Sequence, residues 1–279
     1  MAGRLQARSI GMEYYQPRTG KRLLALKNVN LTVEEGEFLS IVGPSGCGKT
    51  TFLNIVDGLL QPTQGQIFLD GRPVNKPGND RGMVFQSGAL MPWRTVEKNI
   101  TFGLECRNWD KKEALEVAKK FTEMVGLVGF ENHYPHELSG GMRQRVNLAR
   151  ALAIDPEILL MDEPFASLDA QTREIMQAEL LAIRAKAKKT ILFVTHQINE
   201  AIFLSDRVIV FSSRPGYVKE EIRIELPRPR YLGIKTEKQF LDYERYIWSI
   251  IEGEVKKTML ADRTTRTGPT GIPDPEKGG

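Results

Sequence analysis

The sequence has few cysteines and no long apolar run. Its two cysteines, Cys47 and Cys106, lie far apart in a chain of 279 residues. Two are too few for a disulfide framework or a metal cluster, so we expect both to be reduced thiols. No segment approaches the about 18 consecutive apolar residues of a membrane-spanning helix, and the N-terminus lacks the apolar core of a signal peptide. These absences predict a protein that is kept in the cytosol.

An excess of charge of one sign is also missing. The 39 Lys and Arg residues are nearly balanced by 35 Asp and Glu residues, and the net charge is only +4. Because the basic residues are spread along the chain, we expect no nucleic acid partner. The chain is 41% hydrophobic, which is enough to bury one substantial core.

Hydrophobic periodicity predicts strands near the N-terminus that lead into a glycine-rich turn, with a helix following over residues 49–57. Residues 66–70 and 81–85 also have strand character and are interpreted as a pair. Residues 110–125 place apolar side chains on one helical face. We therefore interpret them as part of a helical insert that covers about 87–150.

Strand character returns after the insert. Residues 158–162, 190–195 and 206–211 are short, continuous apolar runs separated by helical spacers. Strands of this kind are buried on both faces, which is typical of a largely parallel sheet covered by helices. The predicted fold class is α/β: a mixed or parallel core sheet, an N-terminal antiparallel β region and an inserted α-helical subdomain.

The C-terminal part divides into three segments. The main domain is expected over 5–235, and a Pro- and Arg-rich segment at 227–230 breaks its pattern. Residues 236–260 are predicted to form a helical extension, which could pack on its own domain, extend a dimer or act as a regulatory tail. Residues 261–279 have little apolar content and are predicted to be disordered.

Residues 43–50 match the pattern G-x-x-x-x-G-K-[ST] between a predicted strand and a predicted helix. Glycine lets the backbone aim amide groups at a phosphate, and the helix N-terminus adds a favourable dipole. In this pattern Lys49 reaches the outer phosphates and the Thr50 hydroxyl holds Mg²⁺. A chance match is expected in roughly 1% of chains of this length, so the segment predicts nucleoside triphosphate binding. The expected phosphate-binding residues are Gly43, Pro44, Ser45, Gly46, Cys47, Gly48, Lys49, Thr50 and Thr51.

A buried apolar run at 158–161 ends in two adjacent carboxylates, Asp162 and Glu163. We expect Asp162 to bind Mg²⁺, directly or through water, and Glu163 to act as the general base that polarises the attacking water. An acidic pair at a strand end is by itself usually a solvated turn. Combined with a phosphate loop, it predicts hydrolysis as well as binding.

A second glycine motif, LSGGMRQRV, begins at residue 138. Ser139, Gly140 and Gly141 open a predicted helix, and their amides and hydroxyl could bind a phosphate. The chain already has a phosphate loop for its own nucleotide, so the physical alternative is that these donors serve the nucleotide of another molecule.

Together these motifs resemble the ATPase subunit of ATP-binding-cassette (ABC) transporters, and the resemblance covers about residues 5–230. In that family LSGG is the signature motif, which binds the γ-phosphate of ATP held by the partner in a head-to-tail dimer. The resemblance implies ATP and Mg²⁺ as cofactors. It also implies a homodimer or close paralogue, integral membrane permease subunits, an indirect substrate-binding protein, and a location at the cytoplasmic face of the membrane.

The resemblance also assigns roles to single residues. Tyr14 matches the aromatic residue that stacks on adenine, with Tyr15 as a possible substitute. Gln86 matches the glutamine that touches Mg²⁺, and Asp169 lies in a loop that crosses the dimer interface. His196 matches the switch histidine that contacts the γ-phosphate. The implied catalytic residues are thus Glu163, His196 and Lys49, and the implied metal ligands are Thr50, Gln86 and Asp162.

Two positions depart from the family pattern. Gln197 follows the switch histidine where an acidic residue is usual, and Asp57 stands where a small residue is common. Neither carries the chemistry, so the resemblance still implies an active ATPase.

The segment around Pro92-Trp93 and the later PRPR sequence resemble ATPases of the nitrate, sulfonate and taurine import group. This implies import of a small anion. Trp93 either packs in the core or forms a wall of the groove that receives a membrane-subunit helix. A soluble ATPase of the same superfamily, acting on DNA, ribosomes or iron–sulfur assembly, is the alternative. A P-loop kinase or small GTPase leaves the signature motif, Gln86 and His196 unexplained.

Overall fold

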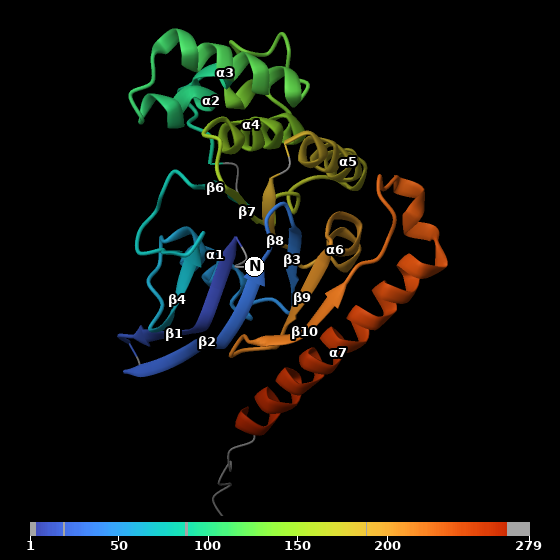
Figure 1. Cartoon of the computed structure of the whole chain (residues 1–279). Coiled ribbons are helices and arrows are strands. Elements are labelled where there is room, and N and C mark those ends of the chain that lie inside the picture. Colours follow the sequence, from blue (N-terminus) through green and yellow to red (C-terminus); the bar gives the residue numbers. More distant parts are fainter. Residues whose placement is uncertain (1–3, 19, 87–88, 188, 267–279) are drawn as a thin grey trace, which may run out of the picture.

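The computed structural model describes residues 4–266 except 19, 87–88 and 188, and it contains two β-sheets (Figure 1). The four-stranded sheet has the order β2-β1-β4-β5 and is antiparallel. Its strands are β1 (Leu5–Gln16), β2 (Lys21–Val33), β4 (Gln64–Leu69) and β5 (Arg72–Pro73). It forms the predicted N-terminal antiparallel region.

The second sheet has six strands in the order β10-β9-β3-β8-β7-β6. Its strands are β3 (Phe38–Val42), β6 (Arg81–Val84), β7 (Ile158–Asp162), β8 (Thr190–Val194), β9 (Arg207–Phe211) and β10 (Val218–Arg223). All neighbours pair in parallel except β10, which runs antiparallel to β9 at the edge. The phosphate loop therefore leaves β3 at the same edge where the parallel strands β7, β8 and β9 end.

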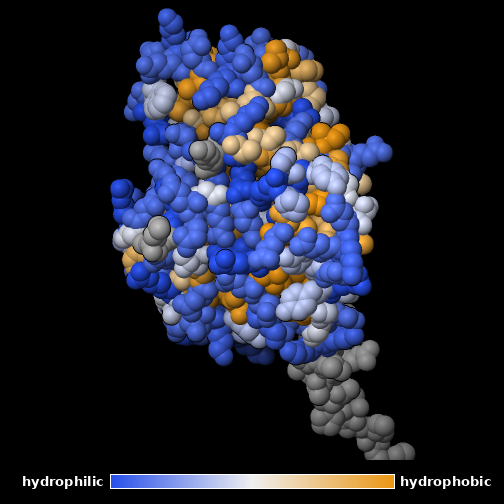
Figure 2. Space-filling model, turned by 45° about the vertical axis from the view of Figure 1, so that its right-hand side comes forward, coloured by the Kyte–Doolittle hydropathy of each residue, from blue (hydrophilic) through white to orange (hydrophobic). Residues whose placement is uncertain are grey.

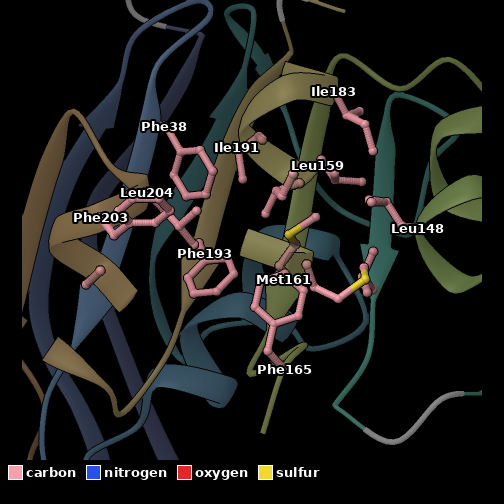
Figure 3. Close-up of a cluster of buried hydrophobic side chains, with 14 of the residues drawn as sticks. Phe38, Leu148, Leu159, Met161, Phe165, Ile183, Ile191, Phe193, Phe203 and Leu204 are labelled. Atoms are coloured by element: carbon pink, nitrogen blue, oxygen red, sulfur yellow. The ribbon is translucent and has the colours of Figure 1, made fainter. Parts of the chain in front are cut away.

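The central strands are buried on both faces, which explains their continuous apolar sequence. In β3, Phe38 and Val42 belong to one core cluster, whereas Leu39 and Ile41 belong to the other. The first cluster lies against the helices, and Figure 3 shows Phe38 and Phe193 facing one another within it. The second cluster joins the six-stranded sheet to α1 (Lys49–Asp57) and the four-stranded sheet.

The expected pairing of residues 66–70 with 81–85 is wrong. The first segment is β4 and pairs with β1 and β5, while the second is β6 and pairs in parallel with β7. The two strands belong to different sheets. Strand character in a sequence reports a pleated, half-buried surface and does not identify the partner strand.

The helices between β6 and β7 gather at the top of the molecule in Figure 1. They are α2 (Val96–Glu105), α3 (Lys111–Met124), the 3₁₀ helix η1 (Pro135–Glu137) and α4 (Gly140–Ala153). Thr95, Asp110 and Ser139 cap α2, α3 and α4 by accepting hydrogen bonds from amides of the first turn. Because α4 also packs on β6 and α5 (Ala170–Ala187), it joins these helices to the core.

The C-terminal helix α7 (Lys238–Arg266) follows the 3₁₀ helix η2 (Leu232–Thr236) and packs against α6 (Ile198–Leu204). Phe240, Ile247 and Ile251 are buried in this contact. The helix continues past residue 260, where the expected extension ends. The remainder of the predicted disordered tail, residues 267–279, lies outside the described residues.

The PRPR segment lies between β10 and η2 and leads the chain into α7. Arg230 is buried and donates to the carbonyls of Ile202, Phe203 and Ser205 at the end of α6. Burial lowers the pKa of Arg230 to about 10. Its guanidinium satisfies carbonyls that a helix end leaves without intrahelical partners, so this arginine fixes the path of the chain into α7.

The face turned forward in Figure 2 is mostly hydrophilic, with apolar side chains in separate patches. Among the residues that the structure describes, no helix combines the length and the apolar character needed to cross a bilayer.

Candidate functional site

The phosphate loop runs from the end of β3 to the start of α1. Gly46 and Gly48 have positive φ angles of 75° and 107°, a region that side-chain-bearing residues rarely adopt. A Cβ at Gly48 would also lie 2.7 Å from Leu26 Cδ2 and 3.1 Å from the Ala25 carbonyl of β2. Glycine is therefore required at position 48 by both backbone conformation and space.

Lys49 is buried inside the loop. Its Nζ donates to the carbonyl of Gly43 at 2.8 Å and to that of Pro44 at 3.1 Å. Cys47 is a free, buried thiol whose pKa is raised by burial, against the opposing effect of Lys49. A thiol in this state is a poor nucleophile, so Cys47 contributes backbone and packing rather than redox chemistry.

A cavity of about 350 Å³ lies beside this loop. It is lined by Tyr14, Leu23, Ala25, Ser45, Gly46, Gly48, Lys49, Thr50, Thr51, Gln86, Glu163 and Arg214. Tyr14 OH lies 3.3 Å from Thr51 Oγ1, whereas Tyr15 is 66% exposed and does not line the cavity. The geometry thus favours Tyr14 over Tyr15 as the aromatic residue of this cavity.

Thr50, which lines the cavity, contacts the buried Asp162. The Thr50 hydroxyl donates to Asp162 Oδ1 at 3.1 Å. Burial raises the pKa of Asp162; the Glu163 charge acts in the same direction, while Thr50 and Lys49 oppose it. Among the described residues, no group of three or more His, Cys, Asp or Glu side chains forms a metal site. One carboxylate and one hydroxyl fit Mg²⁺, which binds few protein oxygens and completes its shell with phosphates and water.

Glu163 lies between two predicted site residues. Its Oε2 is 2.9 Å from His196 Nδ1 and accepts a hydrogen bond from Gln86 Nε2 at 3.3 Å. Its φ angle is +44°, and its amide donates to the Val194 carbonyl of β8 at 2.8 Å. A positive φ at a non-glycine residue is a strained conformation that surrounding contacts must maintain. The strand ends of β6, β7 and β8 therefore bring three polar side chains together.

Ser139, Gly140 and Gly141 do not line this cavity. Ser139 and Gly140 are exposed, and the Ser139 hydroxyl accepts from the Met142 amide at the start of α4. A Cβ at Gly141 would lie 2.7 Å from Thr172 Cγ2, so α4 begins in close contact with the start of α5.

Asp169 caps the same end of α5. Its Oδ1 accepts from the Thr172 amide at 3.0 Å, and this hydrogen bond lowers the pKa of the Asp169 carboxyl. Asp169 is exposed. The signature segment and the Asp169 loop thus lie side by side on the surface, apart from the phosphate-loop cavity.

Arg214 is a cavity residue that the sequence interpretation missed. It lies in the segment after β9, and its Nε and Nη2 donate to the Gly46 carbonyl at 3.2 and 3.0 Å. Because β9 runs parallel to β3, the segments that follow both strands meet at one edge of the sheet. The motif SSRPG directly after an apolar run was the signal that could have identified Arg214.

Comparisons with known proteins agree with this arrangement. A model of the family described as ABC transporter matches residues 26–166. An uncharacterised ABC transporter ATP-binding protein of Methanocaldococcus jannaschii is 58% identical over 86% of this chain and 89% of its own length. A nitrate import ATP-binding protein of Synechocystis is 47% identical over 84% of this chain and 91% of its own length. A taurine import ATP-binding protein of Escherichia coli is 44% identical over 81% of this chain and 90% of its own length.

A solved structure supports the same relationship. A dimeric, post-hydrolysis ATP-binding cassette bound to ADP and Pi is 35% identical, with a TM-score of 0.70 over 80% of this chain and 100% of the cassette. This likeness confirms the predicted α/β fold of a P-loop ABC ATPase, and the relatives confirm the predicted family and its resemblance to import ATPases. The chain therefore belongs to the ABC transporter family, as an ATP-binding subunit with ATPase activity.

Proposed function

We propose that two copies of this chain, or this chain and a close paralogue, bind Mg·ATP between them and couple its hydrolysis to the import of a small anion. The observation that carries this proposal is the separation of two half-sites. The phosphate loop lies in a cavity, while the segment from Ser139 to Gly141 lies outside it, with Ser139 and Gly140 exposed. In a head-to-tail dimer each half-site would complete that of the other copy.

ATP would then hold the dimer together. The amides and hydroxyl at the start of α4 are donors suited to a phosphate. Asp169 lies beside them and would cross the same interface. Because each nucleotide contacts both chains, binding would favour the closed dimer, and loss of the γ-phosphate would open it.

Each site residue of one chain would have its own role in ATP binding or hydrolysis. Glu163 would accept a proton from the attacking water, and His196, 2.9 Å away, would orient Glu163 and contact the γ-phosphate. Lys49 would offset the charge that develops on the phosphates. Mg²⁺, held by Thr50 and Asp162 with Gln86 nearby, would supply additional positive charge. Tyr14 would stack on the adenine.

The permease would bind at the helical insert. Trp93 is 75% exposed, so it does not pack in the core. It lines a groove of about 720 Å³ together with α2 and the start of α3, and Trp109 also lines this groove. A groove lined by aromatic and charged residues is suited to receive a helix of another subunit.

The nature of the cargo is supported by the relatives, which are named for import of nitrate and taurine. We propose nitrate, a sulfonate or a taurine-like anion for this chain, delivered by a substrate-binding protein to the permease. The anion itself would not contact the ATPase. Through the permease, the chain would lie at the cytoplasmic face of the membrane.

A complementation experiment tests the shared site. Lys49→Ala disables the phosphate loop, and Ser139→Arg blocks the start of α4. Each variant alone should lose ATP hydrolysis, but an equal mixture should recover about a quarter of the wild-type rate, because half of the dimers are mixed and each mixed dimer has one intact site. A site contained in one chain predicts no recovery. Circular dichroism of each variant would show that both still fold.

A further inference from the structure

The segment between β9 and β10 is wedged against the phosphate loop. The Gly216 amide donates to the Ala25 carbonyl at 2.8 Å, and its carbonyl accepts from the Lys27 amide at 2.9 Å. A Cβ at Gly216 would lie 2.1 Å from the Cys47 carbonyl. Since this distance is to backbone, even a methyl group at position 216 would clash with the loop, so the segment packs closely against the loop while its hydrogen bonds hold it to β2.

Arg214 makes the direct connection from this segment to the loop. Its two donors converge on the carbonyl of Gly46, the residue with a φ angle of 75° in the middle of the loop. A guanidinium that donates twice to one carbonyl fixes both the position and the orientation of that peptide. Arg214 thus holds the carbonyl of this peptide, whereas the amide of the same peptide, that of Cys47, donates to the Pro44 carbonyl within the loop at 3.3 Å.

Ser213, the residue before Arg214, is held by α7. Glu254 is a buried carboxylate on this helix, and its Oε2 accepts from both the amide and the hydroxyl of Ser213 at 3.1 Å. Lys219 and Lys257 pair with Oε1 at 3.3 and 3.2 Å. Burial works against the charged form, but the Ser213 hydrogen bonds and the two lysines hold the pKa of Glu254 below its usual range. An ionised, multiply bonded carboxylate is a firm anchor.

We propose that Arg214 is a positioning residue for ATP binding, and that α7 sets its position through Glu254 and Ser213. This inference rests on the proposed binding of ATP at the phosphate loop. In this arrangement Glu254 anchors Ser213, Arg214 follows directly in the chain, and Arg214 holds the Gly46 peptide around the phosphates. The C-terminal helix thereby influences nucleotide affinity although it does not line the nucleotide cavity.

The experiment measures the dissociation constants of Mg·ATP and Mg·ADP on the full chain by calorimetry. Arg214→Ala should weaken both about tenfold, the equivalent of one or two hydrogen bonds that preorganise the loop. Arg214→Lys should restore little, because a lysine cannot reproduce the two parallel donors of a guanidinium. Glu254→Ala should weaken both nucleotides about threefold to tenfold, whereas Glu254→Gln, which keeps the acceptor, should weaken them less.

The double variant tests whether Glu254 affects nucleotide affinity through Arg214 or independently of it. If Glu254 acts through Arg214, the Arg214→Ala, Glu254→Ala variant should bind no more weakly than Arg214→Ala alone. Glu252→Ala, which removes a half-exposed carboxylate that pairs with Lys256 on the same helix, is the matched control and should bind as the wild type does. If Glu254→Ala does not fold, Ser213→Ala replaces it, with an expected loss of about threefold.

The inference would be overturned by wild-type affinity in Arg214→Ala, by wild-type affinity in Glu254→Ala, or by losses that multiply in the double variant. Full rescue by Arg214→Lys would also contradict it, because the charge alone would then suffice. A wild-type chain that binds no ATP would instead refute the proposed function. The two failures are therefore distinguishable.

Discussion

His196 Nδ1 lies 2.9 Å from Glu163 Oε2, although 33 residues separate the two along the chain. Glu163 comes directly after β7 and His196 follows β8 by one intervening residue, Thr195. The two strands are parallel neighbours, so their ends deliver both side chains to the same point. The contact uses only Nδ1 of the imidazole, so Nε2 does not take part in it, and the His196 side chain is half exposed to solvent. This arrangement supports the γ-phosphate contact that we propose for His196.

Glu163→Gln should abolish turnover but retain ATP binding. The amide keeps the size of the side chain yet cannot accept the proton of the attacking water, so the rate should fall by about 10²–10⁴. With ATP unhydrolysed, the dimer should be trapped and visible by light scattering. Glu116→Gln, an exposed position on α3, serves as the control. A Glu163→Gln chain that stays monomeric at saturating ATP and still drives transport would contradict the shared site.

His196→Ala should lower the rate about 100-fold while changing the ATP dissociation constant only a few-fold, because His196 contacts Glu163 and, in the proposed mechanism, the γ-phosphate rather than the adenine. Single-turnover kinetics would separate the chemical step from binding. His136→Ala alters another exposed histidine, in η1, and should leave both values unchanged. Equal loss in the two variants would mean that His196 has no specific role.

Asp206→Asn should destabilise the fold by about 2 kcal/mol at neutral pH. Asp206 accepts from the Phe38 amide at 2.9 Å, and Arg184 and Arg228 pair with its two oxygens at 2.6 and 2.7 Å. Burial opposes ionisation, but the Phe38 amide and the two arginines hold the pKa of Asp206 below its usual range.

The depressed pKa fixes the pH dependence of this effect. The stabilisation is present above the unfolded-state pKa of about 3.9 and is lost as the pH falls through the lower folded-state pKa. Urea titrations of wild type and variant should therefore differ most near pH 7 and converge in acid. Asp242→Asn removes one half of an exposed pair on α7 and should show no such difference. If the difference in unfolding free energy between wild type and variant stays constant down to acid denaturation, the ionised Asp206 carboxylate is not the source of that difference.

The sequence predicted the parts of this fold that depend on local pattern. The helix at 49–57, the buried strands after the insert and the phosphate loop follow from apolar periodicity and glycine spacing, and the structure contains each of them. The pairing of β4 and β6 failed because the partner of a strand depends on contacts between distant residues. Arg214 was missed for the same reason: its significance comes from Gly46, which lies 168 residues away.

Trp93→Ala should weaken association with the membrane partner without changing ATP binding. The side chain is 75% exposed and lines the groove beside α2, which we propose as the permease contact. Removing an aromatic anchor from the centre of an interface costs about 2 kcal/mol or more, a fall of about thirtyfold in affinity. Co-purification from detergent-solubilised membranes would measure the loss of the integral membrane protein.

Val128→Ala is the matched control for this prediction. Val128 is 65% exposed and lies between α3 and α4, but it does not line the groove. It should retain the membrane partner, because losing exposed apolar area outside the contact does not affect docking. If both variants retain the partner equally, the groove is not the permease contact. If both lose it equally, the loss reflects the stability of the helical insert, which thermal denaturation of each variant would reveal.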